Sequence, residues 1–188
     1  MRIISGTAKG KKILQPSDKK TRPLKDIVKE SIFNILNHSN LLNKSLDDCI
    51  VLDLFSGVGS FGLEAISRGV KKVIFFEEYR PAAELLNKNL DILSFNCSAE
   101  INQKNIYDKK NFKNLNYVFD LVFLDPPFKD EKIMFILNSL VESKIINSET
   151  LIIIHRNKKK NDEFNKKFKI VREETYGTSK IIFGCFNF

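Results

Sequence analysis

From residue 49 onward, short apolar runs alternate with segments whose apolar residues recur every three or four positions. The apolar runs predict strands at residues 49–52, 72–76, 97–101, 118–124 and 151–154. The helical periodicity predicts helices at residues 60–68, 81–93 and 132–141. Repeated strand–helix units of this kind predict a parallel sheet with helices on both faces, joined by right-handed crossovers.

The carboxyl-terminal part of the chain departs from this repeat. Apolar runs at residues 169–172 and 180–183 flank Tyr176-Gly177-Thr178, which is typical of an antiparallel hairpin. The chain therefore predicts an α/β, Rossmann-like fold. We expect a mostly parallel seven-stranded sheet that ends in an antiparallel hairpin.

The amino-terminal residues have a different character. Residues 2–14 alternate apolar and polar side chains around two glycines, which favours a short basic hairpin. A helix follows, with Thr21 as its cap and Pro23 in its first turn. We therefore expect a small amino-terminal extension at residues 1–40 and a main domain at residues 41–188.

The net charge of +8 is unevenly distributed. Residues 1–29 carry nine basic and two acidic side chains, a net charge of +7, so the rest of the chain is nearly neutral. A second basic cluster, which we call the 156–172 block, lies near the predicted hairpin. Local positive charge favours a polyanion such as nucleic acid, although solvated surface lysines give the same composition.

The overall composition restricts the class of protein. A chain of 188 residues with 43% hydrophobic and 29% charged residues fits one soluble globular domain. No apolar run reaches the roughly 18–20 residues of a membrane span. Three cysteines, an odd number, indicate reduced thiols, and no Cys/His cluster has metal-site spacing. We expect a cytoplasmic monomer without a metal ion or a membrane partner.

The tetrapeptide Asp125-Pro126-Pro127-Phe128 directly follows an apolar run. The two prolines end the strand and give a stiff turn that offers carbonyl oxygens but lacks their N–H donors. A carboxylate, such a turn and an aromatic ring together can accept the hydrogens of a planar amino group while a flat base stacks on the ring. A proline-stopped turn with one surface phenylalanine is the alternative interpretation.

Gly57, Gly59 and Gly62 match the G-x-G-x-x-G fingerprint of dinucleotide-binding turns. However, Asp53 stands four positions before the first glycine, where a carboxylate would repel a pyrophosphate. S-adenosylmethionine has an ammonium and a sulfonium but no phosphate, so Asp53 favours this cofactor. A nicotinamide-dependent oxidoreductase is the alternative that the glycines permit.

Two further polar positions follow predicted strands. Glu77, after the second strand, is placed to accept hydrogen bonds from ribose hydroxyls. Asn105 and Ile106, after the third strand, offer a polar and an apolar contact to an adenine ring. Because the carboxyl ends of parallel strands form the ligand crevice, we expect these residues to lie around one site with Asp53.

This arrangement resembles the class I S-adenosylmethionine-dependent methyltransferases, and the Asp125 tetrapeptide is similar to their amino-group-methylating signature. Amino-terminal segments narrow the resemblance to the RsmD family of bacterial 16S ribosomal RNA guanine-N2 methyltransferases, over essentially the whole chain. The segments are Arg2-Ile3-Ile4-Ser5-Gly6, Gly10-Lys11-Lys12, Thr21-Arg22-Pro23, Val28-Lys29-Glu30-Ser31-Ile32-Phe33-Asn34 and Asp53-Leu54-Phe55-Ser56-Gly57.

The resemblance implies methylation of guanine 966 in 16S ribosomal RNA, within an assembling small subunit. The implied catalytic residues are Asp125, Pro126, Pro127 and Phe128. The implied cofactor site consists of Asp53, Phe55, Ser56, Gly57, Gly59, Glu77, Asn105, Ile106 and Asp125. We expect RNA contacts from Arg2, Lys9, Lys11, Lys12, Arg22 and Lys29.

One position departs from the family pattern. The family often has an acidic residue two positions after the ribose-binding glutamate, where this chain has Tyr79. Glu78 is the nearest substitute, but alternation along a strand would point it to the opposite side.

Other interpretations remain open from the residues alone. The protein could methylate amino groups in another RNA or in DNA, at adenine N6 or cytosine N4, or act as a non-catalytic RNA-binding assembly factor. His155, placed after the fifth strand, is a candidate RNA contact, and Tyr176 is a candidate for the base pocket. An incidental strand-end histidine and a plain hairpin turn are the simpler interpretations of these two residues.

Overall fold

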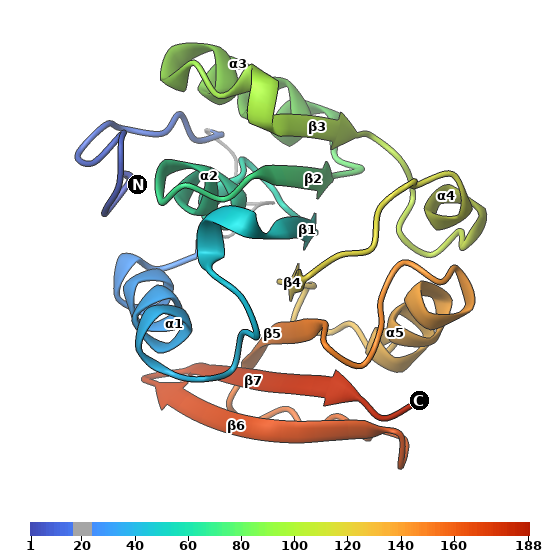
Figure 1. Ribbon diagram of the computed structural model, residues 1–188. Coiled ribbons are helices and arrows are strands. Elements are labelled where there is room, and N and C mark those ends of the chain that lie inside the picture. The colour runs from blue at the N-terminus through green and yellow to red at the C-terminus, as the bar shows by residue number, and fades with distance from the viewer. Residues whose placement is uncertain (17–23) are drawn as a thin grey trace.

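The computed structural model describes residues 1–16 and 24–188, and it shows one twisted sheet with helices on both faces (Figure 1). The strands are β1 (Ile50–Leu54), β2 (Lys72–Phe76), β3 (Ala99–Asn102), β4 (Leu121–Leu124), β5 (Leu151–Asn157), β6 (Phe168–Tyr176) and β7 (Ser179–Phe186). The helices are α1 (Asp26–His38), α2 (Ser60–Ser67), α3 (Arg80–Leu93), α4 (Lys110–Lys113) and α5 (Ile133–Glu142), with 3-10 turns η1 (Leu46–Asp48) and η2 (Asn96–Ser98). None of the helices in these described ranges is long and apolar enough to cross a membrane.

The strand order is β3-β2-β1-β4-β5-β7-β6. Strands β1 to β5 run parallel, whereas β7 is antiparallel to both β5 and β6. The chain winds from β1 toward β3 on one side and then from β4 outward on the other, so the order reverses between β1 and β4. Open sheets of this kind bind ligands in the crevice outside the carboxyl ends of the strands at this reversal. The predicted Rossmann-like fold with its terminal hairpin is confirmed.

The central strands begin and end at slightly different residues from those predicted. β1 extends through Asp53, which therefore lies inside the strand. β4 begins only at Leu121. The Asp120 carboxylate before it accepts the Ile50 N–H at 2.8 Å, while the Asp120 N–H donates to the Ile50 carbonyl at 2.9 Å.

The fifth strand is longer than its apolar core predicts. β5 continues to Asn157 because its antiparallel partner β7 pairs with it beyond the end of β4. His155 and Arg156 are therefore strand residues, and their placement after the strand is corrected. Since successive side chains of a strand point to opposite faces, these two residues project to opposite sides of the sheet.

The amino-terminal segment forms the predicted short hairpin, in which the Ile3 N–H donates to the Lys11 carbonyl and the Gly10 N–H to the Ile3 carbonyl, each at 2.9 Å. One bridge joins Arg2 to Lys12. The backbone also bonds to α2, since the Glu64 carboxylate accepts the N–H groups of Ile4 at 2.7 Å and Ser5 at 3.0 Å. These long-range contacts hold the segment without extended strands.

The first helix begins later than predicted. α1 starts at Asp26, with Lys25 at its N-cap. The predicted cap and first-turn residues, Thr21 and Pro23, lie outside the described residues, as does Arg22.

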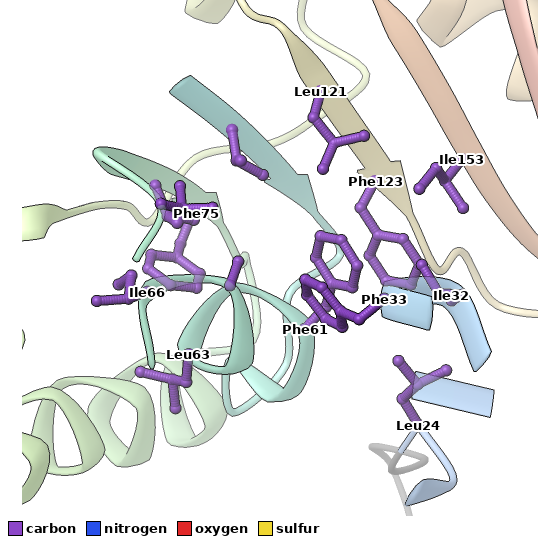
Figure 2. Packing of buried hydrophobic residues seen from close by; sticks show 14 of the residues in the cluster. Leu24, Ile32, Phe33, Phe61, Leu63, Ile66, Phe75, Leu121, Phe123 and Ile153 are labelled. Atoms are coloured by element: carbon purple, nitrogen blue, oxygen red, sulfur yellow. The ribbon is translucent and has the colours of Figure 1, made fainter. Parts of the chain in front are cut away.

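Buried apolar side chains fill both sides of the sheet. One cluster lies beneath α1, α2, α3 and the amino-terminal segment, and the other lies beneath α4 and α5 (Figure 1). In the first cluster, Phe33 of α1, Phe61 of α2 and Phe123 of β4 form a stack with ring-centroid separations of 5.1 and 4.0 Å (Figure 2). Phe123 is two residues before Asp125, so this stack connects α1 to the strand that carries the predicted catalytic motif.

A buried ion cluster also joins the amino-terminal extension to α2. The Lys29 ammonium lies 3.4 Å from the Glu64 carboxylate, with both side chains fully buried, and it donates to the Arg2 carbonyl at 2.8 Å. Arg68 Nε donates to the same carboxylate at 2.8 Å. Burial lowers the pKa of Lys29, and the opposing attraction of Glu64 does not fully offset it. The prediction that Lys29 binds RNA is wrong, because its side chain is inaccessible to a phosphate.

We expect the Glu64→Gln substitution to lower the free energy of unfolding by about 3–5 kcal/mol, because it leaves two cations near a neutral group in a buried site. Urea unfolding measures this change. The matched control is Glu84→Gln on α3, whose pair with Arg80 is solvent-exposed and should change stability by at most about 1 kcal/mol. Equal effects of the two substitutions would contradict the proposed role of the buried cluster.

Candidate cofactor and acceptor site

Three acidic residues lie at the carboxyl edge of the central strands. Asp53 in β1 is in register with Phe75 of β2 and with Phe123 of β4. Glu77 and Asp125 each lie two positions beyond these partners, immediately after their strands. The parallel register therefore brings three carboxylates that are far apart in sequence to one edge of the sheet.

The turn after β1 has a left-handed backbone at three positions. Phe55, Gly57 and Gly59 have φ angles of 59°, 56° and 86°. This conformation costs a phenylalanine about 1–3 kcal/mol, and such strain is concentrated at ligand sites. A Cβ on Gly57 would meet nothing within 4 Å, whereas one on Gly59 would lie 2.4 Å from Leu86. Gly57 therefore borders open space, and Gly59 allows α3 to pack closely.

Hydrogen bonds fix this turn against the end of β2. Ser56 donates both its N–H and its hydroxyl to the Phe76 carbonyl, each at 3.1 Å. The Glu77 carboxylate accepts the Gly57 N–H at 2.6 Å and the Tyr79 N–H at 2.7 Å. Burial raises the pKa of Glu77, while these two N–H groups oppose the shift. Glu77 is thus held beside the turn, and a carboxylate has acceptor positions beyond these two.

Asp53 is buried, with 1% of its surface exposed. Its Oδ2 accepts the Gly62 N–H at 3.0 Å, while its Oδ1 has no hydrogen-bond partner among the described residues. Burial raises the pKa of Asp53 well above its usual range; the Gly62 N–H opposes this, and the Asp125 and Glu77 charges add to it. Such a carboxylate is stabilised in its ionised form by a nearby cation or hydrogen-bond donor.

The loop after β3 is organised by its own side chains. Asn105 Oδ1 accepts the Tyr107 N–H at 2.7 Å, and Asn105 Nδ2 donates to Glu78 at 3.3 Å. Ile106 is 3% exposed and belongs to the second core, which leaves little surface for an adenine ring. Glu78 reaches this loop because β2 ends at Phe76, so the alternation argument that pointed it away is wrong.

Tyr107 connects the loops that follow β3 and β4, and nothing in the sequence singled it out. Its hydroxyl donates to the Asp130 carboxylate, and its ring centroid lies 6.1 Å from that of Phe55. Burial, reinforced by Asp130, raises the pKa of Tyr107, which keeps the hydroxyl a donor. Tyr107 thereby joins the turn after β1, which we call the cofactor turn because it is predicted to bind the cofactor, to the loop after β4.

The tetrapeptide after β4 presents the predicted chemical groups. Asp125 retains 15% exposure of its side chain, Pro126 is buried and Pro127 is exposed. The half-buried Phe128 ring meets the His155 ring edge-on, with centroids 6.0 Å apart. A carboxylate and an aromatic ring therefore lie together on a rigid turn.

Two consecutive residues of β5 hold this turn. His155 Nδ1 donates to Asp125 Oδ1 at 2.8 Å. The fully buried Arg156 donates to the Pro127 carbonyl at 3.3 Å and to the Asp130 carbonyl at 2.6 Å, while it forms a bidentate pair with Asp162. The two side chains leave β5 on opposite sides and both reach the turn, because β5 extends along β7 beyond the end of β4, and this extension is not visible in the apolar pattern.

Burial of Arg156 also changes the interpretation of the 156–172 block. This residue holds the turn after β4 from inside the protein and is not part of a basic surface. Tyr176 likewise has a structural contact, because its hydroxyl hydrogen-bonds Ser31 of α1. The exposed lysines of the block include Lys158, Lys159, Lys166, Lys167 and Lys169.

The amino-terminal segment presents basic side chains near the cofactor turn. Arg2, Lys9, Lys11 and Lys12 are exposed, as expected for RNA contacts. The predicted contact Arg22 lies outside the described residues.

Asn89 of α3 connects this segment to the glycine-rich turn. Its Oδ1 accepts the Leu14 N–H at 2.8 Å, and its Nδ2 donates to the Val58 carbonyl at 3.2 Å. The basic segment therefore ends beside the predicted cofactor site.

Comparison with known proteins shows which family the chain is similar to. The family described as Conserved hypothetical protein 95 matches residues 1–185. Ribosomal RNA small subunit methyltransferase D of Haemophilus influenzae is 36% identical over 94% of this chain and 89% of its own length. YlbH of Bacillus subtilis, provisionally named an rRNA methyltransferase, is 31% identical over 96% of both chains. The solved structure of yhhF from Escherichia coli, provisionally named a methyltransferase, has a TM-score of 0.81 and 27% identity over 99% of this chain and 97% of its own. This chain belongs to the matched family, the RsmD family of S-adenosylmethionine-dependent methyltransferases.

Proposed function

We propose that this protein transfers a methyl group from S-adenosylmethionine to the N2 amino group of a guanine in 16S ribosomal RNA. The observation that carries the proposal is the position of Asp125-Pro126-Pro127-Phe128 beside the buried carboxylates of β1 and β2. The name of the Haemophilus influenzae relative supports small-subunit ribosomal RNA as the substrate, and the family resemblance supports guanine 966. Family membership removes the oxidoreductase alternative.

The residues around the turn after β1 fit S-adenosylmethionine. The unpartnered Asp53 Oδ1 suits an ammonium group, directly or through water, and the open side of Gly57 leaves room for the ligand backbone. Glu77 would accept hydrogen bonds from the ribose hydroxyls, while the Asn105 loop and Tyr107 would border the adenine. When bound, this cofactor supplies an electrophilic methyl group on a sulfonium.

The turn formed by Asp125-Pro126-Pro127-Phe128, which we call the acceptor turn, would orient the nucleophile. The exocyclic nitrogen of guanine is weakly nucleophilic because its lone pair is delocalised into the ring. Asp125 and the Pro126 carbonyl would accept its two hydrogens and direct the lone pair at the methyl group, so positioning is more important than a strong base. Phe128 would stack on a base extruded from its neighbours, which contributes about 1–3 kcal/mol.

The exposed amino-terminal cations would hold the RNA backbone. Arg2, Lys9, Lys11 and Lys12 add affinity that depends on salt but carries little sequence information. We place the protein in the cytoplasm as a monomer that acts on an assembling small subunit.

We expect Asp125→Ala to lower methyl transfer to 16S ribosomal RNA at least about 100-fold, because the carboxylate fixes the amino group in the reactive geometry. The affinity for S-adenosylmethionine, measured by calorimetry, should stay within a few-fold. Asp48→Ala, at an exposed aspartate in η1, is the control. Near-normal turnover of Asp125→Ala would refute its assigned role.

Binding of S-adenosylmethionine should weaken as the pH falls. The pKa of Asp53 in the ligand-free protein is raised, and the bound cation favours the ionised carboxylate. Lowering the pH protonates Asp53 and so weakens binding. Because the pKa is raised, this loss of affinity begins at pH values above the ordinary carboxyl pKa of about 4. Asp53→Asn keeps an acceptor for Gly62 and should bind more weakly with a flatter pH dependence. Asp48→Asn, exposed in η1, is the control. An unchanged pH profile in Asp53→Asn would exclude this carboxylate from cofactor binding.

Replacement of Lys9, Lys11 and Lys12 by glutamine should raise the apparent KM for RNA and flatten its salt dependence. Each lost phosphate contact should reduce the slope of log affinity against log salt by about 0.7–0.9. The charge-matched control replaces Lys166, Lys167 and Lys169 by glutamine. If both triple variants change the slope equally, net charge rather than the amino-terminal segment determines the affinity.

A further inference from the structure

His155 lies at the centre of a short buried hydrogen-bond chain. Its side chain is 3% exposed, and its two ring nitrogens contact Asp125 Oδ1 at 2.8 Å and Ser179 Oγ at 2.9 Å. The ring also meets Phe128 edge-on. One residue of β5 thus contacts both the carboxylate and the aromatic ring of the acceptor turn.

The chemistry of the partners sets the direction of the hydrogen bond between the imidazole ring and the carboxylate. An ionised carboxylate only accepts, so Nδ1 carries a hydrogen and donates to Asp125. The other ring nitrogen, Nε2, is hydrogen-bonded to the Ser179 hydroxyl, which can either donate or accept. Both ring nitrogens therefore have a hydrogen-bond partner, and the contact with Nδ1 holds the Asp125 carboxylate in one orientation.

The same connectivity of aspartate, histidine and serine occurs in hydrolases that use serine as a nucleophile. Ser179 does not suit that role here, because it is 2% exposed and lies within the paired strands β5, β6 and β7. A substrate carbonyl has no approach to its hydroxyl. Of the three hydrogen-bonded residues, Asp125 is the most exposed. The hydrogen bonds through His155 and Ser179 therefore support the Asp125 carboxylate.

We propose that His155 is a positioning residue for methyl transfer, which orients the Asp125 carboxylate and the Phe128 ring toward the acceptor base. This inference rests on the proposed function. A carboxylate has about four acceptor positions, so the hydrogen bond from His155 is compatible with hydrogen bonds from the substrate amino group. The role differs from RNA contact, since the buried ring has almost no surface to offer a phosphate or a base.

Two substitutions of His155 by residues with amide side chains distinguish a positioning role from a role in packing alone. In His155→Asn the amide nitrogen stands near the place of Nδ1 and can still donate to Asp125. In His155→Gln the amide reaches the place of Nε2 and loses that contact, although its polarity is the same. His155→Ala removes both contacts, and His38→Ala, exposed on α1, is the control.

The experiment measures kcat and KM for methyl transfer to small subunits from a strain that lacks the gene, together with the thermal midpoint of each variant. We expect His155→Ala and His155→Gln to lower kcat about 10- to 100-fold while KM for S-adenosylmethionine stays within about threefold. His155→Asn should retain most of kcat, and His38→Ala should match the wild type.

Four outcomes would overturn the inference. Wild-type kcat in His155→Ala would show that Asp125 needs no support. Equal losses in the asparagine and glutamine variants, or losses of kcat that simply follow the thermal midpoints, would show that His155 is a packing residue. Absence of transfer by the wild-type protein would instead overturn the proposed function, and this inference with it.

Discussion

The burial of Asp53 at the end of β1 is the constraint on which the functional edge of this sheet depends. Parallel strands covered on both faces exclude water, so a carboxylate there loses hydration and its pKa rises. Glu77 and Asp125 add like charge from the neighbouring strands. A cationic ligand reduces the repulsion among these three carboxylates, and S-adenosylmethionine carries the positive charge that does so.

The surrounding structure holds this edge in a receptive geometry. The strained Phe55 and the flexible glycines shape the turn, and hydrogen bonds to Phe76 and Glu77 fix it. On the other side of the reversal point, β5 extends along β7 and supports the acceptor turn through His155 and Arg156. The antiparallel hairpin therefore has a second role beyond forming the edge of the sheet, because pairing with β7 fixes the positions of these two β5 residues.

The apolar pattern predicted the sheet, its order of elements and the carboxyl-edge position of Asp53, Glu77 and Asp125, since strand period and turn chemistry are local properties. Tertiary partners were not predictable in the same way. Lys29 looked like a surface cation because its partner Glu64 is distant in sequence. Arg156 looked like part of a basic block for the same reason, with its carbonyl acceptors in the turn after β4. The extension of β5 depends on pairing with β7, which no local signal encodes.

Mass spectrometry of small-subunit ribosomal RNA from a strain that lacks this gene tests the central claim most directly. We predict that one guanine loses its N2-methyl group and that the gene restores the methyl group when returned on a plasmid. An RNA methylation pattern identical to that of the parent strain, or the loss of a methyl group from a ring atom of a different base, would contradict it.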